Sequence, residues 1–268
     1  MKKIKDIEAD IQRDHIPKPI YSCDICSDTG WVDVDGTEAQ STLIIEDFDF
    51  VTGKTVERKR CGCVIQRDFE NKLLRAGLEP ILHKIKTKEY VRKYDWQKEL
   101  YLKARSFIED NNQGLIISGQ TGSGKTLLLG QMLYNFAHKG KEVFYFDWHN
   151  DYKGLLIDRY NVVDEGIMDK LLTVDVLYID DLFKVENNDY TQLRNHEIMD
   201  ARKIIDRRSQ LPHLKTMISM ELNSSDMENI EPSLNGRMIE LVGTFDNWVQ
   251  MDPKEDRNIR LQQAKGEF

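Results

Sequence analysis

The sequence predicts an α/β fold in which helices cover both faces of a parallel sheet, preceded by a small N-terminal domain built around cysteines. Three observations predict it. From residue 114 onward apolar strands alternate with helical stretches, a glycine-rich loop follows the first of these strands, and all four cysteines lie in the first quarter of the 268 residues. Nearly continuous apolar strands are typical of sheets that are buried on both faces.

The N-terminal part of the chain is expected to be a compact module with a helix leading out of it. Residues 3–14 predict a short polar helix, which the prolines of IPKPI end. Short β-prone segments then lie between two cysteine pairs. Apolar residues at helical spacing predict the exit helix: Ile65, Phe69, Leu73 and Leu74. Because Gly77 and Pro80 end it, we place the boundary near residue 85, with domains 1–85 and 86–268.

The second domain is expected to begin with a helix before the sheet starts. The apolar face of this helix consists of Leu100, Ala104, Phe107 and Ile108. Four apolar strands follow, separated by helical stretches: residues 114–118, 142–147, 174–180 and 215–220. This alternation of strand and helix predicts the parallel sheet.

The segment GQTGSGKT fits the pattern G-x-x-x-x-G-K-[ST] of a phosphate-binding loop, and it lies between an apolar strand and a helical stretch, as the pattern requires. Backbone N–H groups of such a loop point at the phosphates of a nucleotide. We expect Lys125 to reach the β and γ phosphates of ATP and the Thr126 hydroxyl to hold Mg²⁺. A structural glycine turn is the alternative. The candidate nucleotide-binding residues are Gly119, Gln120, Thr121, Gly122, Ser123, Gly124, Lys125 and Thr126.

A magnesium site of this kind also needs an acidic residue at the end of a neighbouring strand. The segment VDVLYIDDLF supplies two such residues. We expect Asp180 to coordinate Mg²⁺ through water, and Asp181 to orient and polarise the water that attacks the nucleotide. The alternative is a pair of exposed aspartates that merely ends a strand.

The two cysteine pairs, Cys23-x2-Cys26 and Cys61-x-Cys63, offer four thiolates for a tetrahedral zinc ion. The second pair is more closely spaced than usual. Because the module has few large apolar residues, it would gain folding free energy from the metal. The alternatives are an iron–sulfur cluster or four unliganded thiols, and His15 is an alternative ligand.

Charge and hydropathy limit the classes of function. A net charge of −8 weakens bulk attraction to nucleic acid, so any nucleic-acid contact is expected to be local. No apolar run approaches the length of about 18 residues that a membrane helix needs, and the N-terminus lacks the apolar core of a signal peptide. The protein is therefore expected in the cytoplasm, where the reducing conditions favour a metal site over disulfides.

The order of these motifs resembles the bacterial and phage replicative helicase loaders of the DnaC/DnaI type, which are AAA+ ATPases. The resemblance covers residues 21 to about 250. The loop and the aspartate pair are common to many ATPases, so the cysteine module and the segments IIDRRSQ and KTMISMEL carry the specific weight. The other matching segments are LLRAGLEP, YLKARSFIED and LNGRMIEL.

The resemblance implies an AAA+ three-layer fold and an ATP-dependent loader of the replicative DNA helicase, acting on single-stranded DNA during replication initiation. It implies that the cysteine module docks on the hexameric helicase ring. The ATPase domain would bind ATP, contact single-stranded DNA and self-associate, with slow, assembly-dependent hydrolysis. Arg237 falls at the arginine finger of the family, where it would reach a neighbouring subunit's site; a solvated helix arginine is the alternative.

Two features depart from the family pattern. The sensor position at the end of the KTMISM strand, often asparagine in the family, is Glu221, with Asn223 two residues further on. A carboxylate there would repel the γ-phosphate unless it pairs with a cation or turns away. No sensor-2 arginine is evident after Arg237, and the last 31 residues leave little room for a helical lid.

One segment offers stacking and phosphate contacts to single-stranded DNA because it interleaves aromatic and basic residues. These residues are Trp148, His149, Tyr152, Lys153, Arg159 and Tyr160. The alternative is a loop and helix packed over the sheet.

Three other functions stay open from the sequence. They are a transposition helper ATPase of the IstB kind, an adaptor that binds ATP without turnover, and a P-loop kinase for a small molecule. The cysteine module argues against the first and Glu221 favours the second. The lack of an evident lid or acceptor site argues against the third.

Overall fold

The computed structural model describes residues 22–34, 44–49, 54–152, 166–185, 189–254 and 257–266. The expected polar helix over 3–14 lies outside the described residues, as do His15, Lys153, Arg159 and Tyr160. The chain divides into two compact units, residues 1–71 and 72–268. Helix α3 (Glu79–Thr87) therefore belongs to the second unit, although the boundary expected near residue 85 placed most of it in the first.

The first unit contains a small antiparallel sheet. Its strands are β1 (Trp31–Asp33), β2 (Ile44–Asp49) and β3 (Lys54–Arg60), in the order β1-β3-β2. The register sets Trp31 opposite Arg60 and Ile44 opposite Lys59. Helix α2 (Gly62–Arg75) follows β3 at once, so the second cysteine pair lies at this strand-to-helix junction.

The second unit is built on a five-stranded sheet in which all neighbouring strands are parallel, in the order β5-β6-β7-β4-β8. Its strands are β4 (Gly114–Gly119), β5 (Val143–Asp147), β6 (Val176–Leu182), β7 (Lys215–Met220) and β8 (Trp248–Met251). The four predicted strands are confirmed. The edge strand β8 was not predicted, and it pairs with β4 so that Met251 lies opposite Gly119.

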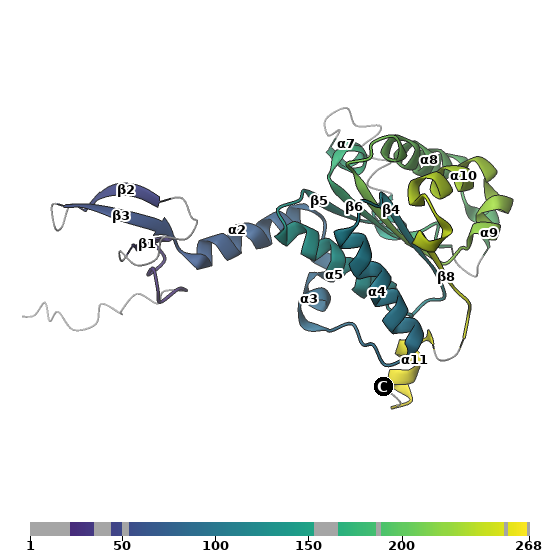
Figure 1. Ribbon diagram of the computed structural model, residues 1–268, viewed down its shortest axis with the longest axis horizontal. Helices are drawn as coiled ribbons and strands as arrows, with labels where there is room; N and C mark the ends of the chain where they lie inside the picture. Colours follow the sequence, from purple (N-terminus) through teal and green to yellow (C-terminus); the bar gives the residue numbers. More distant parts are fainter. Residues whose placement is uncertain are drawn as a thin grey trace, which may run out of the picture. The chain divides into compact units, whose positions relative to one another are not determined.

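Helices cover both faces of this sheet (Figure 1). One face carries α3, α4 (Asp95–Glu109) and α5 (Lys125–His138). The other carries α7 (Gly166–Thr173), α8 (Asn195–Ser209), α9 (Ser224–Ile230) and α10 (Pro232–Val242). The remaining elements are the short helices η2 (Tyr190–Gln192), η3 (Phe245–Asn247) and α11 (Ile259–Ala264). The predicted α/β fold with a doubly covered parallel sheet is confirmed.

Strand β4 shows why the sheet is buried. Its residues Leu115, Ile116 and Ile117 have no exposed surface. Successive side chains of a strand point to opposite faces, and Ile116 packs in the apolar core together with residues of α8 and α10. Both faces of the strand must therefore be apolar. Among the described helices, none is long and apolar enough to cross a membrane.

The aromatic residues after β5 belong to the core. Residues 148–152 are helical, and Trp148 and Tyr152 are 3% and 4% exposed. Their rings stack with centroids 4.9 Å apart, and the Tyr152 hydroxyl donates to Asp200 Oδ2 at 2.6 Å. The hypothesis that these two rings stack on DNA bases is therefore wrong, because they are buried; the alternative of packing over the sheet is confirmed for them.

The buried guanidinium of Arg208 joins α7 to β7. Its nitrogens donate to the carbonyls of Val174 at 3.1 Å and Lys215 at 2.7 Å, and to the Thr216 hydroxyl at 2.8 Å. Burial lowers the pKa of Arg208 to about 10. This residue of the IIDRRSQ segment thus satisfies backbone acceptors where α7 ends and β7 begins.

Replacing Arg208 by methionine keeps an apolar stem but leaves several buried oxygens without a donor, at roughly 1–3 kcal/mol for each. We expect Arg208→Met to lower the free energy of unfolding by about 3 kcal/mol in urea denaturation. The control is Arg207→Met, one residue earlier and exposed, which should change it by less than about 0.5 kcal/mol. Equal effects of the two changes would contradict this role of Arg208.

Candidate functional site

The glycine-rich loop connects β4 to α5, as predicted. Two of its glycines are required by backbone geometry. Gly119 has a φ of 141°, and a Cβ there would lie 2.6 Å from the Met251 carbonyl oxygen; Gly124 has a φ of 90° at the N-cap of α5. The loop therefore adopts a conformation that residues with a side chain rarely enter.

Lys125 is folded into this loop. Its Nζ donates to the carbonyls of Gly119 at 2.7 Å and Gln120 at 3.0 Å, and the residue is only 6% exposed. Burial lowers the pKa of Lys125, whereas Asp181, Glu221 and Asp180 act in the opposite direction. The lysine thus lies inside the loop, where the charges of three carboxylates act on it.

The side chains of Gln120 and Ser123 stabilise the loop through hydrogen bonds. Gln120 donates to the Lys254 carbonyl and accepts from the Lys254 N–H, both at 2.8 Å. The Ser123 hydroxyl donates to the Gln120 carbonyl at 3.0 Å. These two side chains are engaged within the protein. We therefore predict that this part of the loop contacts phosphates through its backbone and not through the side chains of Gln120 and Ser123.

Asp180 lies near the end of β6, is 3% exposed, and accepts hydrogen bonds from four hydroxyls. Tyr178 donates to its Oδ1 at 2.6 Å and Tyr145, from β5, to its Oδ2 at 2.9 Å. Ser219, from β7, also donates to Oδ1. Buried carboxylates are costly unless they are hydrogen-bonded, so these hydroxyls allow a charged group to stand here.

Burial and the neighbouring Asp180 raise the pKa of both Tyr145 and Tyr178. The two phenols therefore stay protonated and can only donate to the carboxylate. Thr126, at the start of α5, donates to Asp180 Oδ1 at 3.3 Å. The two groups expected to hold Mg²⁺ are thus adjacent, and a hydroxyl paired with a fixed carboxylate suits a hard cation that prefers oxygen ligands.

Asp181 has a backbone conformation that regular strands do not use. Its φ is 53°, and the register between β6 and β7 shifts between Ile179 and Leu182. In a regular strand two successive side chains point to opposite faces. A bulge redirects the chain, and here the Asp181 side chain lines the cavity beside the loop while its N–H donates to Ser219 Oγ at 3.1 Å.

The cavity beside the loop is about 280 Å³ in volume and rich in basic side chains. Besides Lys125 and Thr126, four cationic residues line it: Lys84 and Lys88 on or next to α3, Lys184 after β6, and Arg260 on α11. Burial, followed by the charges of Arg260 and Lys88, lowers the pKa of Lys84. Such a concentration of cations fits a polyphosphate.

These four cations were missed by sequence reasoning. Arg260 lies on a helix of six residues, and the Ile259 N–H next to it donates to the Gly122 carbonyl at 3.0 Å. Apart from Lys125, no cationic residue of the same chain was expected at this site, and no arginine after Arg237 was expected to reach it, whereas Arg260 lines the cavity. A lysine-rich helix surface and a short C-terminal helix carry no pattern that sets them apart from solvated segments.

Glu221 follows β7 and accepts a hydrogen bond from the Thr121 hydroxyl at 2.5 Å. It lines a second, adjoining cavity with Tyr190 and Asp226 and not the basic one. Its carboxylate is therefore turned to a loop hydroxyl. Asn223 is also engaged, because its side chain accepts from the Asp226 N–H and caps α9.

Arg237 forms ion pairs outside the basic cavity of its own chain. It lies on α10, its side chain is 40% exposed, and it pairs with Asp206 at 2.9 Å and Glu240 at 2.7 Å. It does not line the basic cavity. An arginine finger at this residue would therefore act on another subunit, and that stays a prediction.

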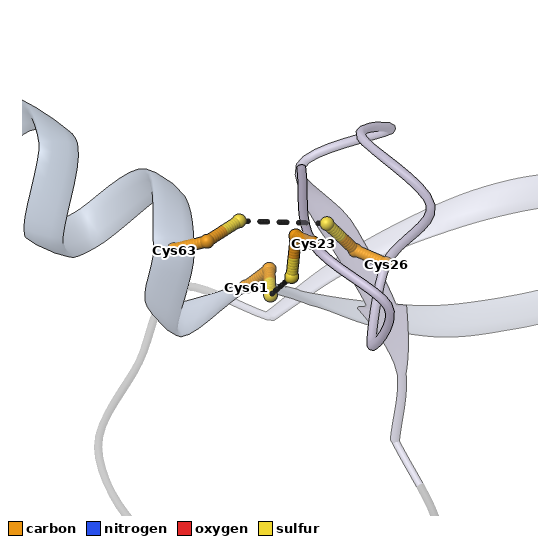
Figure 2. A group of neighbouring side chains, drawn as sticks. All are labelled: Cys23, Cys26, Cys61 and Cys63. Atoms are coloured by element: carbon orange, nitrogen blue, oxygen red, sulfur yellow. Dashed lines mark hydrogen bonds between the residues drawn. The ribbon is translucent and has the colours of Figure 1, made fainter. Parts of the chain in front are cut away.

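The four cysteines form a second candidate site, in the first unit (Figure 2). Their sulfur atoms all lie within 4.8 Å of one another, with Cys23 and Cys61 3.8 Å apart and Cys26 and Cys63 3.5 Å apart. A zinc ion at about 2.3 Å from each sulfur gives sulfur–sulfur separations of roughly 3.8 Å. The cluster therefore fits a tetrahedral zinc ion.

The turn that carries the first pair is held by its own side chains. Asp28 accepts from the N–H groups of Ser22 and Cys23 at 2.9 and 3.0 Å, and the Cys61 N–H donates to the Gly30 carbonyl at 2.8 Å. The two cysteine pairs are thus brought together by backbone geometry.

The thiols differ in how readily they lose a proton. Hydrogen bonds from the backbone of Cys26 and Ile25 lower the pKa of Cys23 to about 7. The neighbouring thiols of Cys26 and Cys61 raise the pKa of Cys63 to about 12. Four thiolates so close together repel one another, which a divalent cation relieves.

A family described as "Helicase HerA, central domain" matches residues 97–233, which is about half of the chain. A curated protein of Bacillus subtilis, the uncharacterized protein YqaM, is 24% identical over 216 residues, covering 73% of this chain and 68% of its own. The replicative helicase loader DnaC of Buchnera aphidicola is 25% identical over 162 residues, which is 58% of this chain and 63% of that protein.

Among solved structures, the replication initiator DnaA bound to AMPPCP and single-stranded DNA superimposes with a TM-score of 0.50 at 14% identity, over 67% of this chain and 52% of that one. At this identity the likeness shows the fold. Together with the sheet order, it confirms the expected three-layer α/β fold with a parallel sheet.

We expect about one zinc ion per chain when the purified protein is analysed for metals, because the module has few apolar residues to hold it together. Cys61→Ser removes one of four ligands and should lower zinc content by at least about tenfold. Ser27→Ala, in the same turn but outside the cluster, is the matched control and should keep the metal. Iron with inorganic sulfide would indicate a cluster instead, and a folded module without metal would contradict the site.

Proposed function

Because the chain belongs to the P-loop ATPase family described as helicase HerA, central domain, and is similar to replicative helicase loaders, we propose that it loads a replicative DNA helicase onto single-stranded DNA in an ATP-controlled step. The observation that carries the proposal is the basic cavity between the loop and Asp181, next to the hydroxyl-held Asp180. The protein would act in the cytoplasm during replication initiation.

In this proposal the phosphates of ATP lie in the basic cavity against the loop backbone and Lys125. Thr126 and Asp180 would hold magnesium, which would neutralise charge on the β and γ phosphates. Asp181 orients the attacking water, since it is the carboxylate that faces the cavity. The turn of Glu221 toward Thr121 reduces its repulsion of the γ-phosphate.

The partner that the proposal assigns to the cysteine module is the helicase ring. The module exposes an apolar residue at its turn, since Ile25 between Cys23 and Cys26 is 79% exposed, and Ile65 on α2 is 44% exposed. Exposed large apolar side chains favour a protein contact over a nucleic-acid contact. The acidic balance of the chain agrees with this assignment.

An adaptor that binds ATP without turnover is the second candidate function. It is favoured by one observation, the pairing of Asp181 with Lys184 at 2.6 Å. A carboxylate held by a lysine is a weaker acceptor for a water proton. The two functions differ in hydrolysis but share the nucleotide site.

The direct test of the proposal is capture of the cognate replicative helicase with and without ATP. Wild-type chain should retain the helicase and transfer it to circular single-stranded DNA only with ATP. Lys125→Ala should bind ATP at least about tenfold more weakly, since it removes a charged contact to the phosphates, and should not transfer the helicase. Failure of the wild-type chain to bind the helicase under either condition would contradict the loader function.

Arg237 gives a test of self-association. We expect Arg237→Ala to bind ATP normally but to hydrolyse it about 100-fold more slowly with the helicase present, since a finger acts on transition-state charge. Mixing it with Lys125→Ala chains should restore part of the activity, because some interfaces then pair an intact pocket with an intact arginine. Wild-type turnover by Arg237→Ala would show that this residue is not the finger and favour the adaptor.

A further inference from the structure

We infer that Lys184 is a second cation for the γ-phosphate in the same chain, and that it is held on Asp181 until ATP takes it. The inference rests on the proposed ATPase function and adds a residue to its site. Three observations carry it: the Lys184–Asp181 ion pair, the cavity that both residues share with Lys125, and the tight turn between them.

The ion pair lines the basic cavity beside the loop. Lys184 Nζ is 2.6 Å from Asp181 Oδ2, and the two side chains are 35% and 26% exposed. Both residues line the same cavity as Lys125 and Thr126. A phosphate group bound against the loop therefore has the Lys184 ammonium within the same walls.

The turn that brings the pair together is unusual and well anchored. Asp181 and Phe183 both have left-handed backbones, with φ values of 53° and 57°, and the Lys184 N–H donates to the Asp181 carbonyl at 3.1 Å. Phe183 is 1% exposed, with its ring 5.8 Å from the Trp148 ring. Left-handed residues other than glycine are strained and persist only where the surroundings fix them.

The charges around the ion pair indicate where Lys184 moves. In the ion pair Lys184 neutralises the carboxylate that should orient water, so Asp181 is occupied while the pair holds. A γ-phosphate presents more negative charge than one carboxylate and competes for the ammonium. When Lys184 moves to it, Asp181 is released to accept from water. ADP lacks this group, so it leaves the pair intact.

The other cations of the cavity do not have this property. Lys84, Lys88 and Arg260 line the same cavity but belong to α3, the residue after it, and α11. None of them is paired with Asp181 among the described ion pairs. They attract phosphates in general, whereas Lys184 couples γ-phosphate recognition to the release of Asp181.

The test compares ATP and ADP affinities of the full chain by calorimetry in excess magnesium. Lys184→Met keeps the apolar stem and removes the charge. We expect it to weaken ATP binding about tenfold and ADP binding by less than about twofold, as for one charge-assisted hydrogen bond. The matched control is Lys88→Met, which removes a charge from the same cavity and should weaken both nucleotides by similar factors.

A second variant tests the same ion pair while leaving Lys184 in place, in case Lys184→Met disturbs the turn. Asp181→Asn removes the competitor for Lys184, so ATP affinity should rise several-fold while ADP affinity is unchanged. In the Lys184→Met background the same change should have no such effect, because the two residues act as a pair.

Two outcomes contradict the inference without contradicting the proposed ATPase function. One is that Lys184→Met weakens ATP and ADP binding equally. The other is that Asp181→Asn tightens ATP binding in the Lys184→Met background. A wild-type chain that binds neither nucleotide contradicts the proposed function itself, and the inference with it.

Discussion

One buried carboxylate organises the second unit. Asp180 is 3% exposed near the end of the interior strand β6, and burying a charge without hydrogen bonds is costly. Its donors come from each neighbour of that position: Tyr145 on β5, Tyr178 on β6, Ser219 on β7 and Thr126 on α5. Three strands and the helix after the loop are thus tied to the same two oxygen atoms. The proposed magnesium site follows from this arrangement, because it fixes the distance between the loop and the sheet.

The cysteine cluster is the charged centre of the first unit. The first unit has a three-stranded sheet and no large apolar core among its described residues, and its two cysteine turns meet through backbone hydrogen bonds. In both units a charged centre replaces some of the packing that a larger core would supply. The two centres are chemically independent, since one uses oxygen donors and the other sulfur. This agrees with the proposal that one unit binds a partner and the other binds a nucleotide.

Much of this was predictable from the residues. Four strands, the loop, the aspartate pair and the cysteine pairs are each encoded by a local pattern. Strand β8 was missed because Trp248–Met251 is too short to show alternation and contains the polar Gln250. The hydroxyls of Tyr145 and Ser219 were missed because they come from neighbouring strands that lie 35 and 39 residues away from Asp180 in the sequence. Arg260 reaches the cavity through tertiary packing, and the bulge at Asp181 depends on the backbone rotation of one residue. No residue spacing in the sequence indicates either.

The most direct measurement of the central claim is nucleotide affinity over a series of magnesium concentrations for Tyr145→Phe and Tyr178→Phe. Each change removes one hydroxyl from Asp180 and keeps the ring. Loss of such a supporting contact typically weakens metal binding about 10–100-fold, so the magnesium midpoint should rise by that order in both variants. Tyr152→Phe, which removes an equally buried hydroxyl from Asp200 at 2.6 Å, should titrate like the wild type. Identical magnesium midpoints in all four proteins would contradict the claim that hydroxyl-held Asp180 completes the site.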